Sequence, residues 1–575
     1  MAEIVTGERQ ATIDPLKHSQ PLGGALVFLG LAGSLPIMHG AQGCASFAKA
    51  LLTRHFNEPI PLQTTAITEV TAVLGSGEAM VETLDAIRKK QRPEIIGLLT
   101  TGVTEVSGED VGGQLRKYLS AWNETDSSGP EAGANGSAPG RAPLIVGVST
   151  PDFIGGLSDG WSAALEALVR AVVPAEHSET EPSEARYFTG RTAFIAASAP
   201  VTHLTTPGSA EAARSTRSTR STRSTRSARS LGSAEAARST RSARSLGSAA
   251  RRVAAADGGA LDPRQLAVLV GPSLTAADLD ELGELIRAFG LDPVLVPDLS
   301  GSVDGHLAPA WQPTTTGGTG LARLRALGRS RAVLVAGATA AAAGDLLAAR
   351  TGARILRHRH LSGLTEMDTL VTELIELTGA SAPARVRQAR ARLADGLLDT
   401  HFVLGGARVA LAMEPETLVA VGSLLHDVGA EVVAAVSPTA APVLADAPWD
   451  EVVVGDLTDL AERARAGGAH LVLGSSHARE VADRIGAAHL PVGFPIFDRL
   501  GAALAGTAGY AGSLRLLIDA ANRLLDHEHV HRRSGRRFSV SGADGQPAHR
   551  TEIPTQPGSA GESDQLDNLF QESPC

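Results

Sequence analysis

One short segment of the sequence combines residue types that bind metals or act as nucleophiles. It runs from His39 through Gly40 and Gly43 to Cys44. The two glycines permit a tight turn, and a helical pattern begins at or near Cys44. A thiol at a helix N-terminus meets partial positive charge and unpaired N–H groups, and both lower its pKa. The segment therefore predicts a thiolate that serves as a nucleophile or as a metal ligand.

A nucleophile and a metal ligand need different residues around them. A nucleophile needs a base, and His39 is close in sequence, but no signature of a cysteine hydrolase surrounds Cys44. An iron–sulfur cluster normally takes four protein thiolates, whereas the chain has two cysteines, Cys44 and Cys575. A cluster at Cys44 would need ligands from a partner subunit. A third interpretation stays open, in which Cys44 is a buried inert thiol and His39 a hydrogen-bonded loop residue.

The composition is typical of a large α/β protein. The chain has 575 residues, of which 43% are hydrophobic and only 3% aromatic. Single cores stop growing near ~250–300 residues, so we expect about three globular units plus tails. Small residues such as Ala and Gly suit closely packed helix and sheet layers. Cys575 falls in a polar tail, so we expect no disulfide with Cys44 and place the chain in the reducing cytoplasm.

Charge is unevenly distributed along the chain. The stretch Gly208–Arg252 carries eleven Arg and two Glu, a local balance of +9, which leaves −19 on the rest of a chain whose net charge is −10. An acidic body does not favour nucleic acid or anionic membranes. The apolar run Leu22–Met38 is interrupted by glycines and Pro36 and is short for a ~20-residue membrane span. We interpret it as a buried strand-and-turn element, and we expect no membrane or nucleic-acid partner.

Short apolar runs alternate with helical periodicity along most of the chain. One helical pattern runs through Leu274, Leu279, Leu282 and Phe289 and stops at Gly290. Alternating strands and helices predict an α/β fold of parallel sheets, in which ligands bind beyond the carboxyl ends of the strands. The predicted strands are Ile95–Leu99, Leu144–Val148, Leu266–Val270, Ala332–Val335, Val409–Ala412, Val432–Val436, Val452–Val454 and Leu471–Leu473.

We expect three α/β domains. They span residues 15–173, which contain Cys44, residues 261–379 and residues 383–526. The connector 174–260 contains a repeat that starts at Gly208 and again at Gly232. The repeat has no hydrophobic period, so we interpret it as a disordered loop rather than a nucleic-acid site. The segment 527–575 is predicted to be a flexible tail; its alternating histidines, His527 to His531, are more typical of solvated residues than of a metal site.

Several motifs resemble a known family. Segments near the N-terminus resemble beta-type subunits of the nitrogenase component 1 superfamily, and later segments resemble the branch that forms the cofactor scaffold. The resemblance covers nearly everything except the Arg repeat and the two ends. The segments that resemble the beta-type subunits are Pro21-Leu-Gly-Gly-Ala, His39-Gly-Ala-Gln-Gly-Cys44, Arg54-His-Phe-Asn-Glu-Pro59, Thr100-Thr-Gly-Val-Thr-Glu-Val-Ser-Gly-Glu-Asp110 and Ser149-Thr-Pro-Asp-Phe153. The segments that resemble the scaffold branch are Pro297-Asp-Leu-Ser-Gly-Ser-Val-Asp-Gly-His306, Thr316-Gly-Gly-Thr319 and Gly493-Phe-Pro-Ile-Phe-Asp-Arg499.

The sequence lacks two of the cysteines that bind a cluster in the catalytic beta subunit of this superfamily. That subunit supplies three cysteines to the large cluster it shares with its alpha partner. The first matches Cys44, whereas the second falls at Leu62 and the third at Gly102. Neither Leu nor Gly binds iron through a side chain. The resemblance implies a [4Fe-4S] cluster with Cys44 as one ligand and three cysteines from the alpha-type scaffold subunit, NifE.

The resemblance also implies a function. Scaffold subunits of this family have three Rossmann-like domains per chain, with the cluster cysteine in the first, and form an alpha-two beta-two heterotetramer. The heterotetramer receives an iron–sulfur precursor of the iron–molybdenum cofactor, which is held mainly by the alpha-type partner. Molybdenum and homocitrate are added there, with transient contact to the nitrogenase reductase and to precursor-supplying assembly proteins. On this interpretation the chain is a scaffold and not an enzyme.

Two enzyme classes are the alternatives. One is an electron-transferring subunit of a nitrogenase-like reductase, either the nitrogenase beta subunit or its counterpart in light-independent protochlorophyllide reductase. The other is a sugar-nucleotide or glycosyl-transfer enzyme with facing Rossmann-like domains, which would contain no iron.

Overall fold

The computed structural model describes residues 2–7, 12–126, 142–174, 188–189, 260–303 and 312–533. Residues Met1–His527 form one compact unit. The Arg-rich stretch Gly208–Arg252, the tail beyond residue 533 and Cys575 lie outside the described residues.

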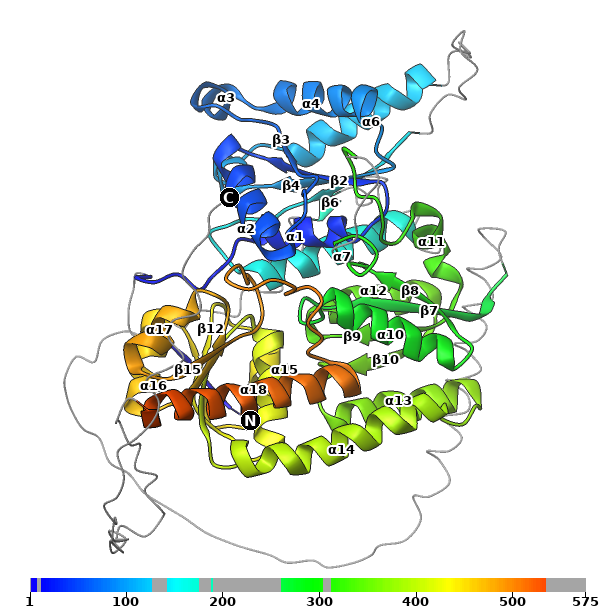
Figure 1. Cartoon of the computed structure of the whole chain (residues 1–575). Coiled ribbons are helices and arrows are strands. Elements are labelled where there is room, and N and C mark those ends of the chain that lie inside the picture. Colours follow the sequence, from blue (N-terminus) through cyan, green and yellow to red (C-terminus); the bar gives the residue numbers. More distant parts are fainter. Residues whose placement is uncertain are drawn as a thin grey trace, which may run out of the picture. The chain divides into compact units, whose positions relative to one another are not determined.

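The first sheet has the strand order β3-β2-β4-β5-β6, and all of its pairs are parallel. Helices α4 and α6 lie on one face of this sheet, and α1 and α7 lie on the other (Figure 1). Apolar side chains of β2 and β4 are divided between these two layers. The strands are β2 (Ser34–His39), β3 (Gln63–Thr64), β4 (Ile95–Thr100), β5 (Leu144–Val148) and β6 (Phe188–Thr189); the helices are α1 (Gln20–Leu29), α2 (Gln42–Phe56), α3 (Glu69–Leu74), α4 (Gly77–Lys90), α5 (Gly102–Ser107), α6 (Val111–Asp126) and α7 (Leu157–Val172).

The second sheet has the order β10-β9-β7-β8 and is also parallel. Its helix α10 is the one predicted from the leucine pattern, and the chain turns out of it at Gly290 with φ of +77°. The elements are β7 (Asp262–Val270), α10 (Ala276–Ala288), β8 (Asp292–Val296), α11 (Leu321–Arg325), β9 (Ser330–Ala336), α12 (Ala341–Thr351), β10 (Arg354–His358) and α13 (Leu364–Thr378), with short 3-10 turns at Ala326–Arg329 and Ala338–Ala340.

The third sheet has the parallel order β1-β13-β12-β11-β14-β15. Its edge strand β1 (Glu3–Thr6) comes from the extreme N-terminus, which the sequence pattern did not assign to any domain. The other elements are α14 (Ala384–Leu404), β11 (Arg408–Ala412), α15 (Pro415–Asp427), β12 (Glu431–Ser437), a 3-10 turn (Pro442–Asp446), β13 (Glu451–Val454), α16 (Leu457–Ala466), β14 (Leu471–Gly474), α17 (Ala478–Ile485), β15 (Ala488–Pro491) and α18 (Gly509–Arg533).

The fold class predicted from the sequence is confirmed. All eight predicted strands are strands, and each of the three sheets is parallel. The domain boundaries themselves stay predictions. No helix among the described residues is long and apolar enough to cross a membrane.

The prediction for Leu22–Met38 is wrong in its first half, which is helix α1 rather than a strand. Pro21 lies in the first turn of α1, where its missing N–H costs nothing. The glycines serve helix packing: a Cβ at Gly23 would lie 1.9 Å from the carbonyl oxygen of Leu157, and one at Gly160 would lie 1.9 Å from that of Gln20. Close contact between α1 and α7 therefore explains glycines that resemble strand-breaking turns in the sequence.

Candidate metal centre

Cys44 lies at the topological switch point of the first sheet. The chain leaves β2 for its neighbour β3 and then crosses to β4 on the other side of β2. The carboxyl ends of β2 and β4 therefore border the crevice where folds of this kind bind ligands. Helix α2 starts at Gln42, so Cys44 is its third residue, and α5 starts at Gly102 directly after β4.

The two loops that border this crevice are in close contact. A Cβ at Gly40 would lie 2.3 Å from Oγ1 of Thr101, so only glycine fits at this position. The Thr101 hydroxyl donates a hydrogen bond to the carbonyl oxygen of His39 at 3.0 Å. This contact fixes the start of α2, and hence Cys44, relative to the end of β4.

Cys44 is half-buried, and the Asp152 carboxylate in the loop after β5 acts on its thiol. Burial raises the pKa of the Cys44 thiol, and the Asp152 carboxylate raises it further; hydrogen bonds from N–H groups at the start of α2 offset only part of this. The prediction that the helix terminus lowers this pKa is therefore wrong, because burial and a like charge outweigh the helix N-terminus. A metal that displaces the proton would restore the thiolate.

Asp152 has an incomplete hydrogen-bond set. Its Oδ1 atom is buried and finds no hydrogen-bond partner among the residues that the structure describes. Burial raises the pKa of Asp152, while backbone N–H groups of Gln20 and Gly102 and the charge of Lys17 lower it. The loops after β2, β4 and β5 thus meet at one place, which contains Cys44, Gly102 and Asp152.

His39 is a structural residue rather than a base for Cys44. Its side chain is fully buried. Its Nδ1 lies 2.9 Å from the Thr65 hydroxyl and its Nε2 lies 3.1 Å from the Ser76 hydroxyl, so both ring nitrogens are engaged. Burial lowers the pKa of His39 to about 4, against the pull of Glu109 toward a higher value. His39 is therefore a hydrogen-bonded structural residue, as the third interpretation expected, but it is the last residue of β2 rather than a loop residue.

Neither Leu62 nor Gly102 contributes a metal ligand. Leu62 is buried in the core with 4% of its surface exposed, and Gly102 begins α5 without a side chain. Among the described residues, Cys44 is the single free cysteine, and no group of three or more His, Cys, Asp or Glu side chains is arranged to hold a metal. A metal centre at Cys44 therefore needs ligands from outside this part of the chain.

Large apolar side chains on the elements next to Cys44 face solvent. Phe47 lies one helical turn after Cys44 and is 77% exposed, as is Val106 on α5, while Phe153, next to Asp152, is 55% exposed. Val103 on α5 is also partly exposed. We call Phe47, Val103, Val106 and Phe153 the Cys44 rim. Large apolar side chains that face solvent on the elements next to a candidate metal ligand favour protein–protein contact.

Comparison with known proteins identifies the family. The model of the family described as nitrogenase component 1 type oxidoreductase matches residues 19–525, which is most of the chain. The chain belongs to the nitrogenase component 1 family. Among solved structures, nitrogenase Cp1 at pH 6.5 has the same fold, with a TM-score of 0.69 and 22% identity over 95% of this chain and 98% of that chain.

Curated relatives place the chain in the NifN branch of the nitrogenase component 1 family. The nitrogenase iron-molybdenum cofactor biosynthesis protein NifN of Bradyrhizobium diazoefficiens is 34% identical over 92% of each chain. The protein of the same name from Rippkaea orientalis is 35% identical over 92% of this chain and 98% of the relative. The one from Rhodobacter capsulatus is 34% identical over 92% of this chain and 95% of the relative.

Two motifs that resemble the nitrogenase component 1 family meet in space, although they lie far apart in sequence. At the C-terminal end of α2, the Arg54 guanidinium lies 4.0 Å from the centre of the Phe497 ring. The backbone N–H of Ile496 donates to Nδ1 of His55 at 3.0 Å, and the rings of His55 and Phe494 stack edge to face. The helix that carries Cys44 at one end is thereby anchored to the third domain at the other.

Three buried histidines predict that the folded chain loses stability in acid. Burial lowers the pKa of His18, His39 and His55 to about 4 from an ordinary value of 6.5. The fold favours the neutral rings, so their contribution to stability is complete above pH 6.5 and is lost as pH falls from 6.5 toward 4. For the fully buried His39 we expect a loss of about 2 kcal/mol between pH 7.5 and pH 5.

Urea unfolding at pH 7.5, 6 and 5 checks this expectation. The variant His39→Asn should lose about 2 kcal/mol less than the wild type between pH 7.5 and pH 5, because the asparagine does not titrate. His426→Asn, at an exposed position on α15, should keep the wild-type pH dependence. Equal pH dependence in the wild type and in His39→Asn would contradict the assignment of His39.

Proposed function

We propose that this chain is the beta-type scaffold subunit on which the iron–molybdenum cofactor of nitrogenase is matured. The proposal depends most on one observation: at the switch point of the first domain, the chain offers a single thiol where the catalytic subunit that it resembles offers three. Its relatives of known name are cofactor biosynthesis proteins. The role that follows is assembly of the cofactor rather than catalysis by this chain.

Cys44 fits one corner of a cluster that is shared with another subunit. Its thiol is half-buried in a ligand crevice, and the described residues around it supply no other thiol. We assign it as one ligand of a [4Fe-4S] cluster whose other three thiolates come from the alpha-type partner, NifE. When bound, such a cluster supplies a redox centre for electron relay. The chain itself fixes the thiol through α2 and shields it from water with the Cys44 rim.

The Cys44 rim is also the proposed contact surface for the partner subunit. We propose that the rim packs against NifE, since burial of four large apolar side chains beside an incomplete metal centre favours association. Two such pairs would form the heterotetramer, with the reductase and the precursor-supplying proteins as transient partners in the cytoplasm. The precursor is held mainly by NifE, and we assign no residue of this chain to it.

The alternatives account for fewer observations. A catalytic nitrogenase beta subunit would require thiols at positions 62 and 102, which here are Leu62 in the core and Gly102 at a helix start. A sugar-nucleotide enzyme has no need of an exposed apolar rim around a lone thiol. The NifN names of the relatives also favour neither alternative.

Transfer of a finished cofactor tests the proposal. The complex of this chain with NifE, loaded with the iron–sulfur precursor, is incubated with molybdate, homocitrate and the reductase, and then with nitrogenase that lacks its cofactor. We expect activation of that nitrogenase with the complex but not with NifE alone. Activation by NifE alone, or none by a complex that holds the precursor, would refute the scaffold role.

A further inference from the structure

The second domain also has a switch-point crevice. The chain passes from β7 to β8 on one side and then crosses to β9 on the other side of β7. Gly271 follows β7 and Gly337 follows β9, and the N–H of Gly271 donates to the carbonyl oxygen of Ala336 at 2.9 Å. Ligands of doubly wound folds bind at this position, beyond two adjacent strand ends.

A carboxylate from the third domain fills this crevice. Glu416 is the second residue of α15, and only 1% of its surface is exposed. The backbone N–H of Thr339 donates to its Oε2 at 2.7 Å, while the hydroxyl of Ser273 and, at 3.4 Å, its backbone N–H donate to Oε1. Both carboxylate oxygens are therefore bound by donors of the second domain.

The glycines at the two strand ends leave the space for this group. A Cβ at Gly271 would lie 2.2 Å from Oε1 of Glu416, and one at Gly337 would lie 2.4 Å from the same atom. Two glycines and donors from two loops form a cradle of the size of one carboxylate. Burial raises the pKa of Glu416, whereas the hydrogen bonds from Ser273 and Thr339 lower it.

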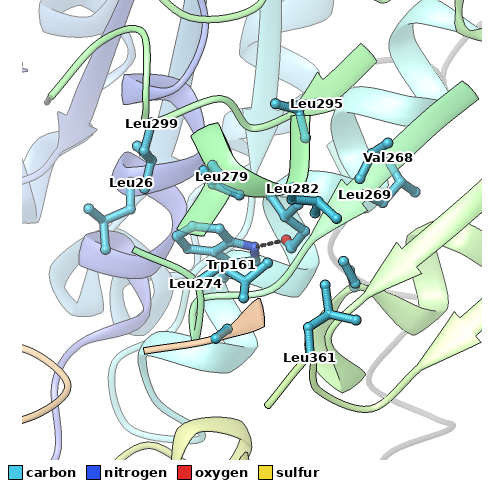
Figure 2. Close-up of a cluster of buried hydrophobic side chains, with 14 of the residues drawn as sticks. Leu26, Trp161, Val268, Leu269, Leu274, Leu279, Leu282, Leu295, Leu299 and Leu361 are labelled. Carbon is cyan, nitrogen blue, oxygen red and sulfur yellow. Dashed lines mark hydrogen bonds between the residues drawn. The ribbon is translucent and has the colours of Figure 1, made fainter. Parts of the chain in front are cut away.

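The first domain contacts the same strand end. The indole N–H of Trp161 on α7 donates to the carbonyl oxygen of Val270, the last residue of β7, at 2.9 Å. Figure 2 shows this bond, with Trp161 packed among Leu26, Leu274 and Leu279. All three domains therefore meet at the end of β7, and Glu416 supplies the contact from the third.

We propose that the crevice of the second domain is a carboxylate-binding site and that Glu416 is its resident ligand. The side chain occupies the position at which an α/β domain of this topology binds an external anion. It thereby joins α15 to the second domain and closes the crevice to nucleotide phosphates. A small monocarboxylate is the ligand class that this cradle accepts once the glutamate side chain is removed.

Chemical rescue of the full-length chain tests the site. Glu416→Ala should lower the thermal unfolding midpoint by several degrees, because three donors lose their acceptor. Sodium formate should restore most of this loss, whereas sodium chloride at the same concentration should not. Leu424→Ala, at a fully buried position on the same helix, should be destabilised as well but gain nothing from formate. No rescue of Glu416→Ala, or equal rescue of both variants, would overturn the proposal.

A second comparison applies if Glu416→Ala is too unstable to purify. Gly271→Ala places a methyl group against the carboxylate, so in the wild-type chain it should lower the unfolding midpoint by several degrees. The double variant Gly271→Ala with Glu416→Ala should then be soluble and purifiable where Glu416→Ala alone is not, because the methyl group enters the vacated space. A double variant as insoluble as Glu416→Ala would contradict contact between the carboxylate and the strand end.

Discussion

Replacement of Cys44 by alanine is expected to remove the iron–sulfur signal from the complex with NifE. A cluster that takes four thiolates loses one quarter of its protein ligands, and no described neighbour offers another thiol. We expect the anaerobically purified wild-type complex to carry about four iron atoms per pair at this site and an electron paramagnetic resonance signal after reduction. Cys44→Ala should lose both or show a clearly altered signal.

The other cysteine of the chain is the matched control for this substitution. Cys575→Ala removes a thiol from the predicted C-terminal tail and should leave iron content and signal unchanged. If Cys44→Ala retains the wild-type iron content and signal, Cys44 is a half-buried thiol and not a ligand.

Negative charge introduced into the Cys44 rim is expected to weaken binding of NifE strongly. Phe47 and Val106 are both 77% exposed, so Phe47→Asp with Val106→Asp should leave the fold of this chain intact. In the complex, each carboxylate would be buried against apolar surface without a partner, at a cost of about 2 kcal/mol or more. Together the two charges should weaken binding of NifE by about 1,000-fold.

Titration of the purified chain against immobilised NifE measures this effect. Phe402 on α14 is 88% exposed and belongs to a different domain, so Phe402→Asp tests whether any charge on an exposed apolar residue has the same effect. Phe402→Asp should bind NifE with wild-type affinity. If the rim variant also binds normally, the surface around Cys44 is not the contact with NifE.

The sequence alone predicts the position of Cys44 well. The glycines before it and the helical pattern after it place the thiol in the first turn of a helix, and α2 begins two residues earlier, at Gln42. The parallel sheets also follow from the sequence, because buried strands give continuous apolar runs that local patterns reveal. The two together are enough to predict a ligand crevice at Cys44.

Properties that depend on distant residues are beyond such patterns. Asp152 lies more than 100 residues from Cys44, yet together with burial it reverses the expected direction of the thiol's pKa shift. Glu416 contacts Ser273 across 143 positions, and nothing local distinguishes it from other helix-starting glutamates. The strand order of the first sheet brings Asp152 close to Cys44, and the packing of the third domain on the second brings Glu416 to the end of β7.

The identity of the fourth ligand tests the central claim most directly. An experimental structure of the anaerobic complex with NifE, with iron located by its anomalous scattering, shows which sulfur atoms bind the interface cluster. We predict three thiolates from NifE and the Sγ atom of Cys44, with no iron bonded at Leu62 or Gly102. A cluster bound by four ligands of NifE, or an interface that leaves Cys44 in solvent, would contradict the account.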